Sequence, residues 1–111
     1  MKRFQYGHRA IDTILPIGTP IIASAAGVVE FSGWNSGGYG NLVVIDHDNG
    51  YRTLYAHQSE RQVATGDQVA QGQRIGLVGS TGWSTHPHLH FEVIINNERV
   101  DPCLHLPTGC D

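Results

Sequence analysis

Glycine divides this chain into short apolar runs, and that division restricts its fold more than any other feature. The 111 residues include 14 glycines and 5 prolines, and no window repeats apolar residues at the i, i+3, i+4, i+7 spacing of an amphipathic helix. Several of the runs are rich in the strand formers Val, Ile, Tyr and Phe. They read TPIIAS, GVVEFSGW, NLVVID, YRTLYAH, QRIGLVG and HLHFEVII. We therefore predict an all-β, compact and mostly antiparallel domain, built as two packed sheets or a flattened barrel.

Two turns can be placed from residue type. HDNGY, residues 47 to 51, lies between two apolar runs, and Asn49 and Gly50 tolerate a positive φ angle, so we predict a β-hairpin there. INNER, residues 95 to 99, predicts a second hairpin.

Length and composition exclude several classes of protein. A chain of 111 residues with 40% hydrophobic residues is expected to form a single domain, residues 1–111.

Its net charge of −3 argues against nucleic acid or an anionic membrane surface as a partner. No apolar run is long enough to cross a bilayer, so no membrane insertion is expected. The opening MKRFQYGHRA lacks the apolar stretch of a signal peptide, so a mature or excised domain, or another export route, is expected.

Residues 88 to 95, HLHFEVII, carry the strongest functional signal. On a strand, Leu89 and Phe91 would point to the core, while His88 and His90 would share the other face with β-carbons about 7 Å apart. On a helix the two histidines would point about 200° apart and could not converge. The pair is therefore a candidate site, although two solvated polar positions on an exposed face would give the same pattern.

Two more segments supply residues of the same chemistry. GHRAID contains His8 and Asp12, and an extended segment would put both on one side. Imidazole nitrogen and carboxylate oxygen both bind zinc, and a site with three protein ligands keeps a fourth position for water. TLYAH ends with His57, in phase with Thr53 and Tyr55. A lone histidine at that place is more often a surface residue.

Together, six segments of the chain resemble one known family. In order they are GHRAID, GTPIIASAAGVV, GYGNLVVIDH, TLYAH, GDQVAQGQRIGLVGSTG and HPHLHFEV. They are similar to the motifs of the lysostaphin-type zinc endopeptidases, or LytM-like domains, which hydrolyse peptide bonds in bacterial peptidoglycan. The match covers about residues 7 to 103. It implies an antiparallel β fold with zinc at the floor of a groove walled by loops.

The resemblance also implies roles for particular residues. His8, Asp12 and His90 match the three zinc ligands, and His57 and His88 match the two histidines that act on the bound water and on the oxyanion. Two neutral imidazoles and one carboxylate leave the zinc centre at a formal +1, which can lower the pKa of a bound water toward about 7. Either catalytic histidine could take the proton, and the residues alone do not decide which.

The chain departs from the family pattern at two positions. Ala10 stands where the family usually has Gly, which could alter the metal geometry slightly. His86 also replaces a Gly, and Pro87 holds it extended, so it is expected at the rim as a bystander or a specificity contact. The possible substrate contacts are Tyr39, Asn41, Trp83 and His86; Tyr39 and Asn41 belong to a glycine-rich segment that could equally be a plain hairpin loop.

Two other functions are suggested by parts of the sequence. A non-catalytic LytM-like domain that regulates another cell-wall hydrolase would typically lose zinc ligands, whereas all three matching positions are present. A biotinyl or lipoyl carrier, suggested by GDQVAQGQRIGLVG, needs a modifiable lysine at a hairpin tip, and the only lysine is Lys2. We therefore expect a monomeric zinc metalloendopeptidase acting on peptidoglycan peptides, while the bond it cleaves is left open.

The remaining histidines and the cysteines are expected outside the site. His47 precedes a predicted turn and should have a structural or solvated role, and His105 has no predicted function. Cys103 and Cys110 could form a disulfide in an extracytoplasmic space (cell wall, periplasm or outside the cell), although free thiols or a metal site with His105 are alternatives.

Overall fold

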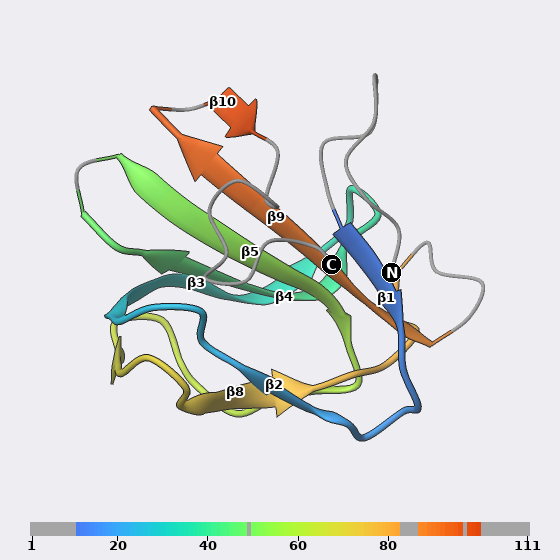
Figure 1. Cartoon of the computed structure of the whole chain (residues 1–111). Helices are drawn as coiled ribbons and strands as arrows, with labels where there is room; N and C mark the ends of the chain where they lie inside the picture. The colour runs from blue at the N-terminus through green and yellow to red at the C-terminus, as the bar shows by residue number, and fades with distance from the viewer. Residues whose placement is uncertain (1–10, 49, 83–86, 97, 101–111) are drawn as a thin grey trace.

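The computed structural model describes residues 11–48, 50–82, 87–96 and 98–100, and for Ile11, Asp12 and Val100 the backbone alone. All regular structure in these residues is β-strand, which confirms the predicted all-β class (Figure 1). None of these residues forms a helix that is long and apolar enough to cross a membrane. The strands are β1 (Ile11–Ile14), β2 (Pro20–Ile22), β3 (Gly27–Asn35), β4 (Gly40–Asp46), β5 (Tyr51–Gln58), β6 (Glu60–Arg61), β7 (Gln68–Val69), β8 (Arg74–Leu77), β9 (His88–Ile95) and β10 (Glu98–Val100).

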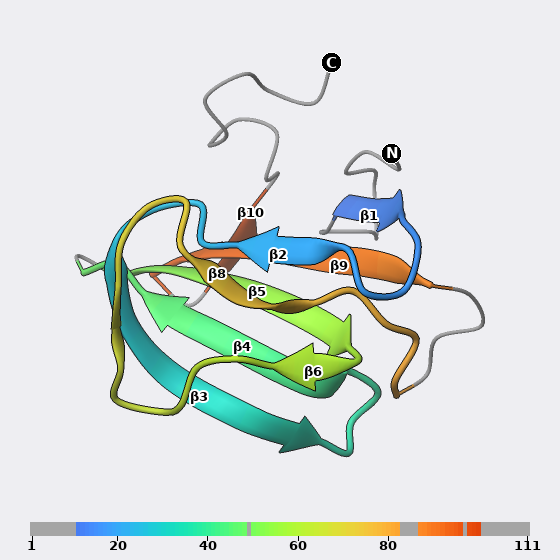
Figure 2. The ribbon, with the colours of Figure 1, turned by 90° about the horizontal axis from the view of Figure 1, so that it is seen from below.

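The strands form two antiparallel sheets. The larger sheet has seven strands in the order β1-β9-β5-β4-β3-β7, with β10 also paired to β9. The smaller sheet has the order β2-β8-β6 and lies across one face of the larger one (Figures 1 and 2). Strand β5 pairs with residues 90–95 of β9, while β1 and β10 pair with successive parts of its other edge. The sequence-predicted arrangement of two packed sheets is therefore observed.

The six apolar runs of the sequence correspond to β2, β3, β4, β5, β8 and β9. Both predicted hairpins are present, joining β4 to β5 and β9 to β10. Asp48 and Gly50 in the first hairpin both have φ of 76°, and Asn96 in the second has φ of 52°. Asn49, which was predicted to share the first turn, lies outside the described residues. The short strands β1, β6 and β7 were not predicted, because they lie outside the six apolar runs, whereas β10 is the second strand of the hairpin predicted at residues 95 to 99.

Alternation of side chains divides the core into two clusters on opposite faces of the larger sheet. The main cluster fills the space between the sheets. The second cluster lies on the face away from the smaller sheet and consists of Leu42, Val44, Leu54 and Ala56, with Tyr39 and Ile94 packed against it. The main cluster consists of Ile21, Ala23, Val29, Val43, Ile45, Tyr55, Val69, Ile75, Val78, Phe91 and Val93.

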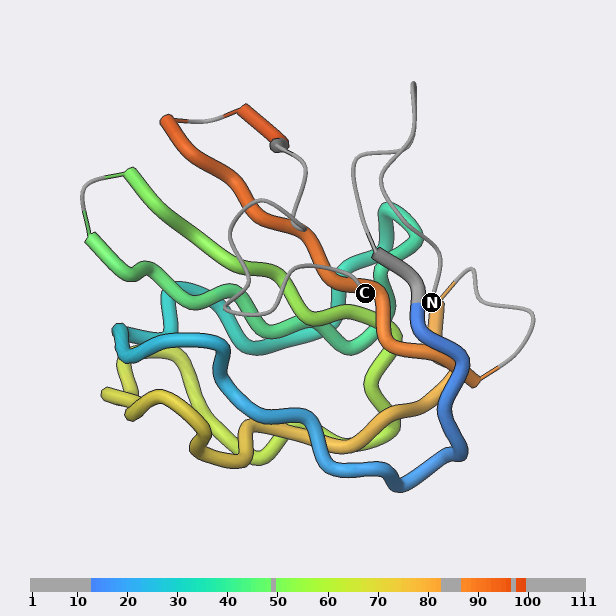
Figure 3. The backbone as a smooth tube through the Cα atoms, in the orientation of Figure 1, coloured from blue at the N-terminus to red at the C-terminus, as the bar shows by residue number. Residues whose placement is uncertain are grey.

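Strands β5 and β9, which carry three histidines, lie side by side within the larger sheet. The tube in Figure 3 shows β9 between β1 and β5. Phe91 and Val93 of β9 enter the main core, so His90 and Glu92, which alternate with them along the strand, are directed to the face of the second cluster. This is the division of faces that the sequence predicted for β9.

Candidate metal and catalytic site

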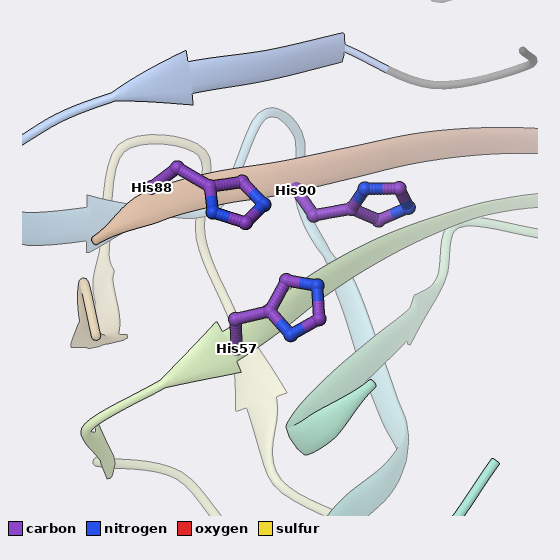
Figure 4. A group of neighbouring side chains, drawn as sticks. All are labelled: His57, His88 and His90. Atoms are coloured by element: carbon purple, nitrogen blue, oxygen red, sulfur yellow. The ribbon is translucent and has the colours of Figure 1, made fainter. Parts of the chain in front are cut away.

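Three histidines from β5 and β9 come together on this face. His57 belongs to the end of β5, and His88 and His90 to the start of β9 (Figure 4). One ring nitrogen from each lies within 4.8 Å of the others. His57 and His88 are buried and His90 is half-buried. Three imidazoles at this separation form a cluster that can hold a divalent cation or act together on one bound molecule.

His57 reaches the cluster through an unusual backbone conformation. Plain alternation would place it on the same face as Thr53 and Tyr55, which are fully buried on the core side. Instead φ of His57 is 61°, in the left-handed region, and the pairing of β4 with β5 shifts register between Asn41 and Val43. The conformation redirects the ring toward His88 and His90. Strained residues of this kind cluster at functional sites, and here the strain is what brings His57 to β9.

Hydrogen bonds to Tyr39 and Thr81 hold His57 in this position. Its backbone N–H donates to the carbonyl oxygen of Tyr39 at 2.8 Å, and its Nδ1 lies 2.6 Å from the carbonyl oxygen of Thr81. A carbonyl only accepts, so Nδ1 carries the proton, and the lone pair of the neutral ring is on Nε2. Thr81 is itself fixed, because its hydroxyl donates to the carbonyl oxygen of Gln58 at 2.8 Å.

His88 is held by a close approach of two backbones. Its N–H donates to the carbonyl oxygen of Gly79 at 3.2 Å, in an isolated β-bridge. A β-carbon on Gly79 would lie 2.3 Å from the backbone nitrogen of Ser59, so a larger residue cannot fit unless the backbone moves. The glycine therefore lets residues 79–81 lie close enough to position both His57 and His88.

His90 is oriented by a buried carboxylate. Its Nε2 lies 2.7 Å from Oε2 of Glu92, and the same oxygen accepts a 2.7 Å hydrogen bond from the hydroxyl of Tyr39. Arg99 of β10 completes the group, with Nε 3.2 Å from Oε1 of Glu92 and Nη2 donating to the Tyr39 hydroxyl at 3.2 Å. Sequence reasoning placed Glu92 on the histidine face but assigned it no role, and it did not single out Thr81 or Arg99.

This network shifts two pKa values. Burial raises the pKa of Glu92, but hydrogen bonds from His90 and Tyr39 and the nearby positive charges outweigh it, so the net pKa is lowered from the ordinary 4.5. Burial, together with the hydrogen bond and negative charge of Glu92, raises the pKa of Tyr39 to about 12. Glu92 is thus an acceptor and Tyr39 a donor at neutral pH.

The predicted metal ligands are only partly described. His8 lies outside the described residues, as do Ala10, Cys103, Cys110 and His105. Asp12 is placed by its backbone, which pairs with His90 between β1 and β9. The register therefore brings residue 12 next to one predicted ligand, His90, from a strand that the sequence did not predict.

The predicted substrate contacts are similarly divided. Trp83 and His86 lie outside the described residues. Tyr39 is half-buried, and its ring centroid lies 5.7 Å from that of His90. The side-chain amide of Asn41 donates to the carbonyl oxygen of Gln58, and its oxygen accepts from Nε of Arg61 at 3.3 Å. Tyr39 therefore borders the histidine cluster, whereas the side chain of Asn41 is engaged with Gln58 and Arg61, the first of which follows His57 in the chain.

His47 lies away from the cluster and has structural contacts. Its Nδ1 donates to the carbonyl oxygen of Ala26 at 2.7 Å, and its Nε2 lies 2.8 Å from the hydroxyl of Thr53. These contacts agree with the structural role expected from the sequence.

The donor chemistry of the cluster fits a zinc ion. Neutral imidazole nitrogen is a zinc ligand, and zinc-binding histidines usually donate their other N–H to a carboxylate or carbonyl group. His90 has such a carboxylate in Glu92, and His57 has such a carbonyl in Thr81. His90, a predicted ligand, therefore has the outer partner that a zinc-binding histidine usually has, and His57 is oriented beside it in the same way.

The comparisons with known proteins define the class of this chain. The family model described as "Peptidase family M23" matches residues 6–102. The chain therefore belongs to peptidase family M23, and the resemblance noted in the sequence is confirmed.

Two similar proteins are named as peptidases. The chain is 54% identical over 102 residues to "DD-carboxypeptidase/endopeptidase Mpg" of Neisseria meningitidis, covering 91% of this chain and 23% of that protein. It is 48% identical over 95 residues to "Peptidoglycan DD-endopeptidase ShyC" of Vibrio cholerae, covering 86% of this chain and 22% of that protein. The chain thus spans about a quarter of the length of these relatives.

Solved structures give the same fold. The catalytic domain of the antimicrobial peptidase lysostaphin from Staphylococcus simulans matches with a TM-score of 0.83 and 39% identity, over 88% of this chain and 77% of that chain. A structure titled as a zinc containing peptidase from Vibrio cholerae matches with a TM-score of 0.83 and 38% identity, over 94% of this chain and 30% of that chain. The lysostaphin-type catalytic fold is therefore present.

Proposed function

We propose that this chain is a zinc-dependent endopeptidase that hydrolyses peptide bonds in peptidoglycan stem peptides or cross-bridges. The observation that carries the proposal is the convergence of His57, His88 and His90 in a member of peptidase family M23. Relatives named as peptidoglycan DD-endopeptidase and as lysostaphin support the substrate class. An extracytoplasmic location, a single catalytic domain and a monomeric state belong to the same proposal.

His8, Asp12 and His90 are the proposed metal ligands. The pairing of Asp12 with His90 supports this set, because it brings two of the three positions together on neighbouring strands. Nε2 of His90 is engaged with Glu92, so Nδ1 is the nitrogen through which His90 would bind the metal. Zinc bound there would act as a Lewis acid and lower the pKa of a water molecule so that it can attack the peptide carbonyl near neutral pH.

His57 and His88 are the proposed catalytic residues. With its Nδ1 proton directed to Thr81, neutral His57 presents the lone pair of Nε2, which suits it to accept a proton from the attacking water. In that state it has no second N–H for an oxyanion, so His88 is the better candidate to donate a hydrogen bond to the tetrahedral intermediate. After accepting the proton, His57 can return it from Nε2 to the leaving amine.

Tyr39, Asn41, Trp83 and His86 are proposed to contact the peptide. The ring of Tyr39 borders the cluster, and the backbone N–H of Asn41 donates to the hydroxyl of Thr81, the residue whose carbonyl holds His57; these contacts support the assignment. The hydroxyl of Tyr39 is already engaged with Glu92, so its ring is the part proposed to meet the substrate.

The experiment that tests this function measures zinc content and the hydrolysis of defined muropeptides. The wild-type chain should bind one zinc per molecule and release cleaved peptides that mass spectrometry identifies. His90→Ala should lose both zinc and activity, whereas His88→Ala should keep most of its zinc and lose turnover. His47→Gln, which changes a histidine with only structural contacts, is the matched control and should keep both.

Three results would contradict the proposal. The wild type could bind no zinc, both site variants could hydrolyse muropeptides as well as the wild type, or the zinc-loaded wild type could fail to cleave any muropeptide. The last result would favour the alternative of a non-catalytic domain that regulates another cell-wall hydrolase.

A further inference from the structure

We infer that Glu92 is a positioning residue of the metal centre, which holds the His90 ring so that Nδ1 faces the metal. This inference rests on the proposed function, in which His90 is a ligand. It assigns a task to a buried acidic residue that stands outside the five residues matched to the family.

The geometry of β9 creates the contact. Glu92 follows His90 by two residues, so both side chains leave the strand on the same face. Their closest atoms, Nε2 and Oε2, are 2.7 Å apart. A carboxylate only accepts hydrogen bonds, so Nε2 must carry the proton, which fixes both the tautomer and the ring rotation. A metal-binding histidine needs this restraint, because a rotated ring would turn its other nitrogen away from the metal.

Glu92 is itself held from two other elements. The side chain is 3% exposed, and a buried carboxylate of this kind persists only when it is paired. Tyr39, just before β4, donates to the same oxygen that His90 uses, and Arg99 of β10 lies 3.2 Å from the other oxygen. The arrangement therefore links the β9–β10 hairpin and the segment before β4 to the orientation of one imidazole.

A purely structural ion pair between Glu92 and Arg99 would look different. Arg99 is 55% exposed, so solvent weakens its attraction, and Oε1, the oxygen that it approaches, has no hydrogen-bond partner among the described residues. The two short hydrogen bonds instead converge on Oε2, which faces His90. The stronger contacts of Glu92 are thus directed toward the proposed ligand.

The test measures zinc affinity by competition with a chromophoric chelator for the wild type, Glu92→Leu and Glu92→Gln. Glu92→Leu removes the acceptor and should weaken zinc binding by about 10- to 100-fold, the usual effect of losing a residue that orients a metal ligand. Glu92→Gln keeps a carbonyl acceptor and should recover a large part of that loss. Glu98→Gln changes an exposed glutamate on the adjoining β10 and should bind zinc as the wild type does.

A second measurement needs no metal. Long-range ¹H–¹⁵N NMR spectra of the zinc-free protein should show neutral His90 as the Nε2–H tautomer in the wild type and in Glu92→Gln. Glu92→Leu should shift it toward the other tautomer. A merely structural role for Glu92 would change the unfolding temperature but would not move this signal. Should Glu92→Leu fail to fold, Glu92→Thr, which favours strands and is too short to reach His90, takes its place.

The outcomes separate this inference from the proposed function. If the wild type binds zinc and cleaves muropeptides but Glu92→Leu retains zinc affinity within about twofold and an unchanged His90 tautomer, the positioning role is wrong while the function stands. A wild type that does not bind zinc would overturn both.

Discussion

Nδ1 of His57 lies 2.6 Å from the carbonyl oxygen of Thr81, so a backbone group decides which nitrogen of this histidine carries the proton. His57 makes this contact because its φ angle is 61°. This conformation turns the ring away from the face of β5 on which alternation would otherwise place it. A positive φ angle strains most residues other than Gly, Asn and Asp. The stability of the domain and the position of this proposed catalytic ring are therefore coupled at one residue.

This coupling predicts a difference between two substitutions at residue 57. His57→Ala and His57→Gly both remove the imidazole, and each should lower kcat for muropeptide cleavage by about 10²- to 10⁴-fold. The glycine variant tolerates the left-handed conformation, so its free energy of unfolding should exceed that of the alanine variant by about 1 kcal/mol. Denaturant unfolding of both variants checks the difference.

Zinc content of the same two variants separates the possible roles of His57. Both should retain zinc if His57 is catalytic and not a ligand. Loss of zinc in both would instead assign His57 to the coordination shell. If the alanine variant were the more stable of the two, the positive φ angle at residue 57 would not strain the backbone.

Gly79 should tolerate no larger residue. In Gly79→Ala the new β-carbon would clash with the backbone of Ser59. The backbone at residue 79 would have to move, which would distort its β-bridge to His88. We expect unfolding to become easier by about 1–3 kcal/mol, with a fall in kcat even at temperatures where the variant stays folded. Gly37→Ala is the matched control, because its β-carbon meets only the movable side chain of Asn35. Equal effects of the two substitutions on stability and kcat would contradict the prediction.

The lowered pKa of Glu92 predicts a pH dependence of stability in the zinc-free protein. A carboxyl group whose pKa is lower in the folded than in the unfolded chain stabilises the fold above its ordinary pKa of 4.5, and the stabilisation is lost as the pH falls through the folded value. The stability advantage of the wild type over Glu92→Gln should therefore be full at pH 6 and shrink below about pH 4. Urea titrations across this range measure it, and an advantage that grows on acidification would refute the assignment.

Thr53 should be a strong determinant of stability, although its side chain lies on the core side of β5 and not among the three histidines. Its hydroxyl is fully buried and lies 2.9 Å from the hydroxyl of Tyr55 and 2.8 Å from Nε2 of His47. Thr53→Val would leave these polar groups without that partner and should lower the free energy of unfolding by about 1–3 kcal/mol. Thr65→Val, at an exposed threonine, should change it by much less. Zinc binding and kcat of Thr53→Val should stay unchanged at temperatures where it is folded.

The sequence predicted most of the sheet and part of the site, for reasons that individual residues make clear. β9 could be predicted because the alternation of polar and apolar residues from His88 to Val93 fixes which face His90 and Phe91 occupy. The position of His57 could not, because a positive φ angle at a residue other than glycine leaves no mark in the pattern. Glu92 had a signal in the sequence, because it is an acidic residue two positions after a predicted ligand. The contact of Arg99 with Glu92 could not be predicted, because the hairpin predicted at residues 95 to 99 does not by itself fix which side chains meet across it.

The location of β5 and β9 within the larger sheet has a consequence for inactivation. Both strands have neighbours on each side, so their backbone amides should exchange with heavy water only when the whole domain opens. We therefore expect His57, His88 and His90 to belong to the most protected cooperative unit of the described residues. Heating should abolish catalysis and native structure in a single transition, with no folded but inactive form preceding it.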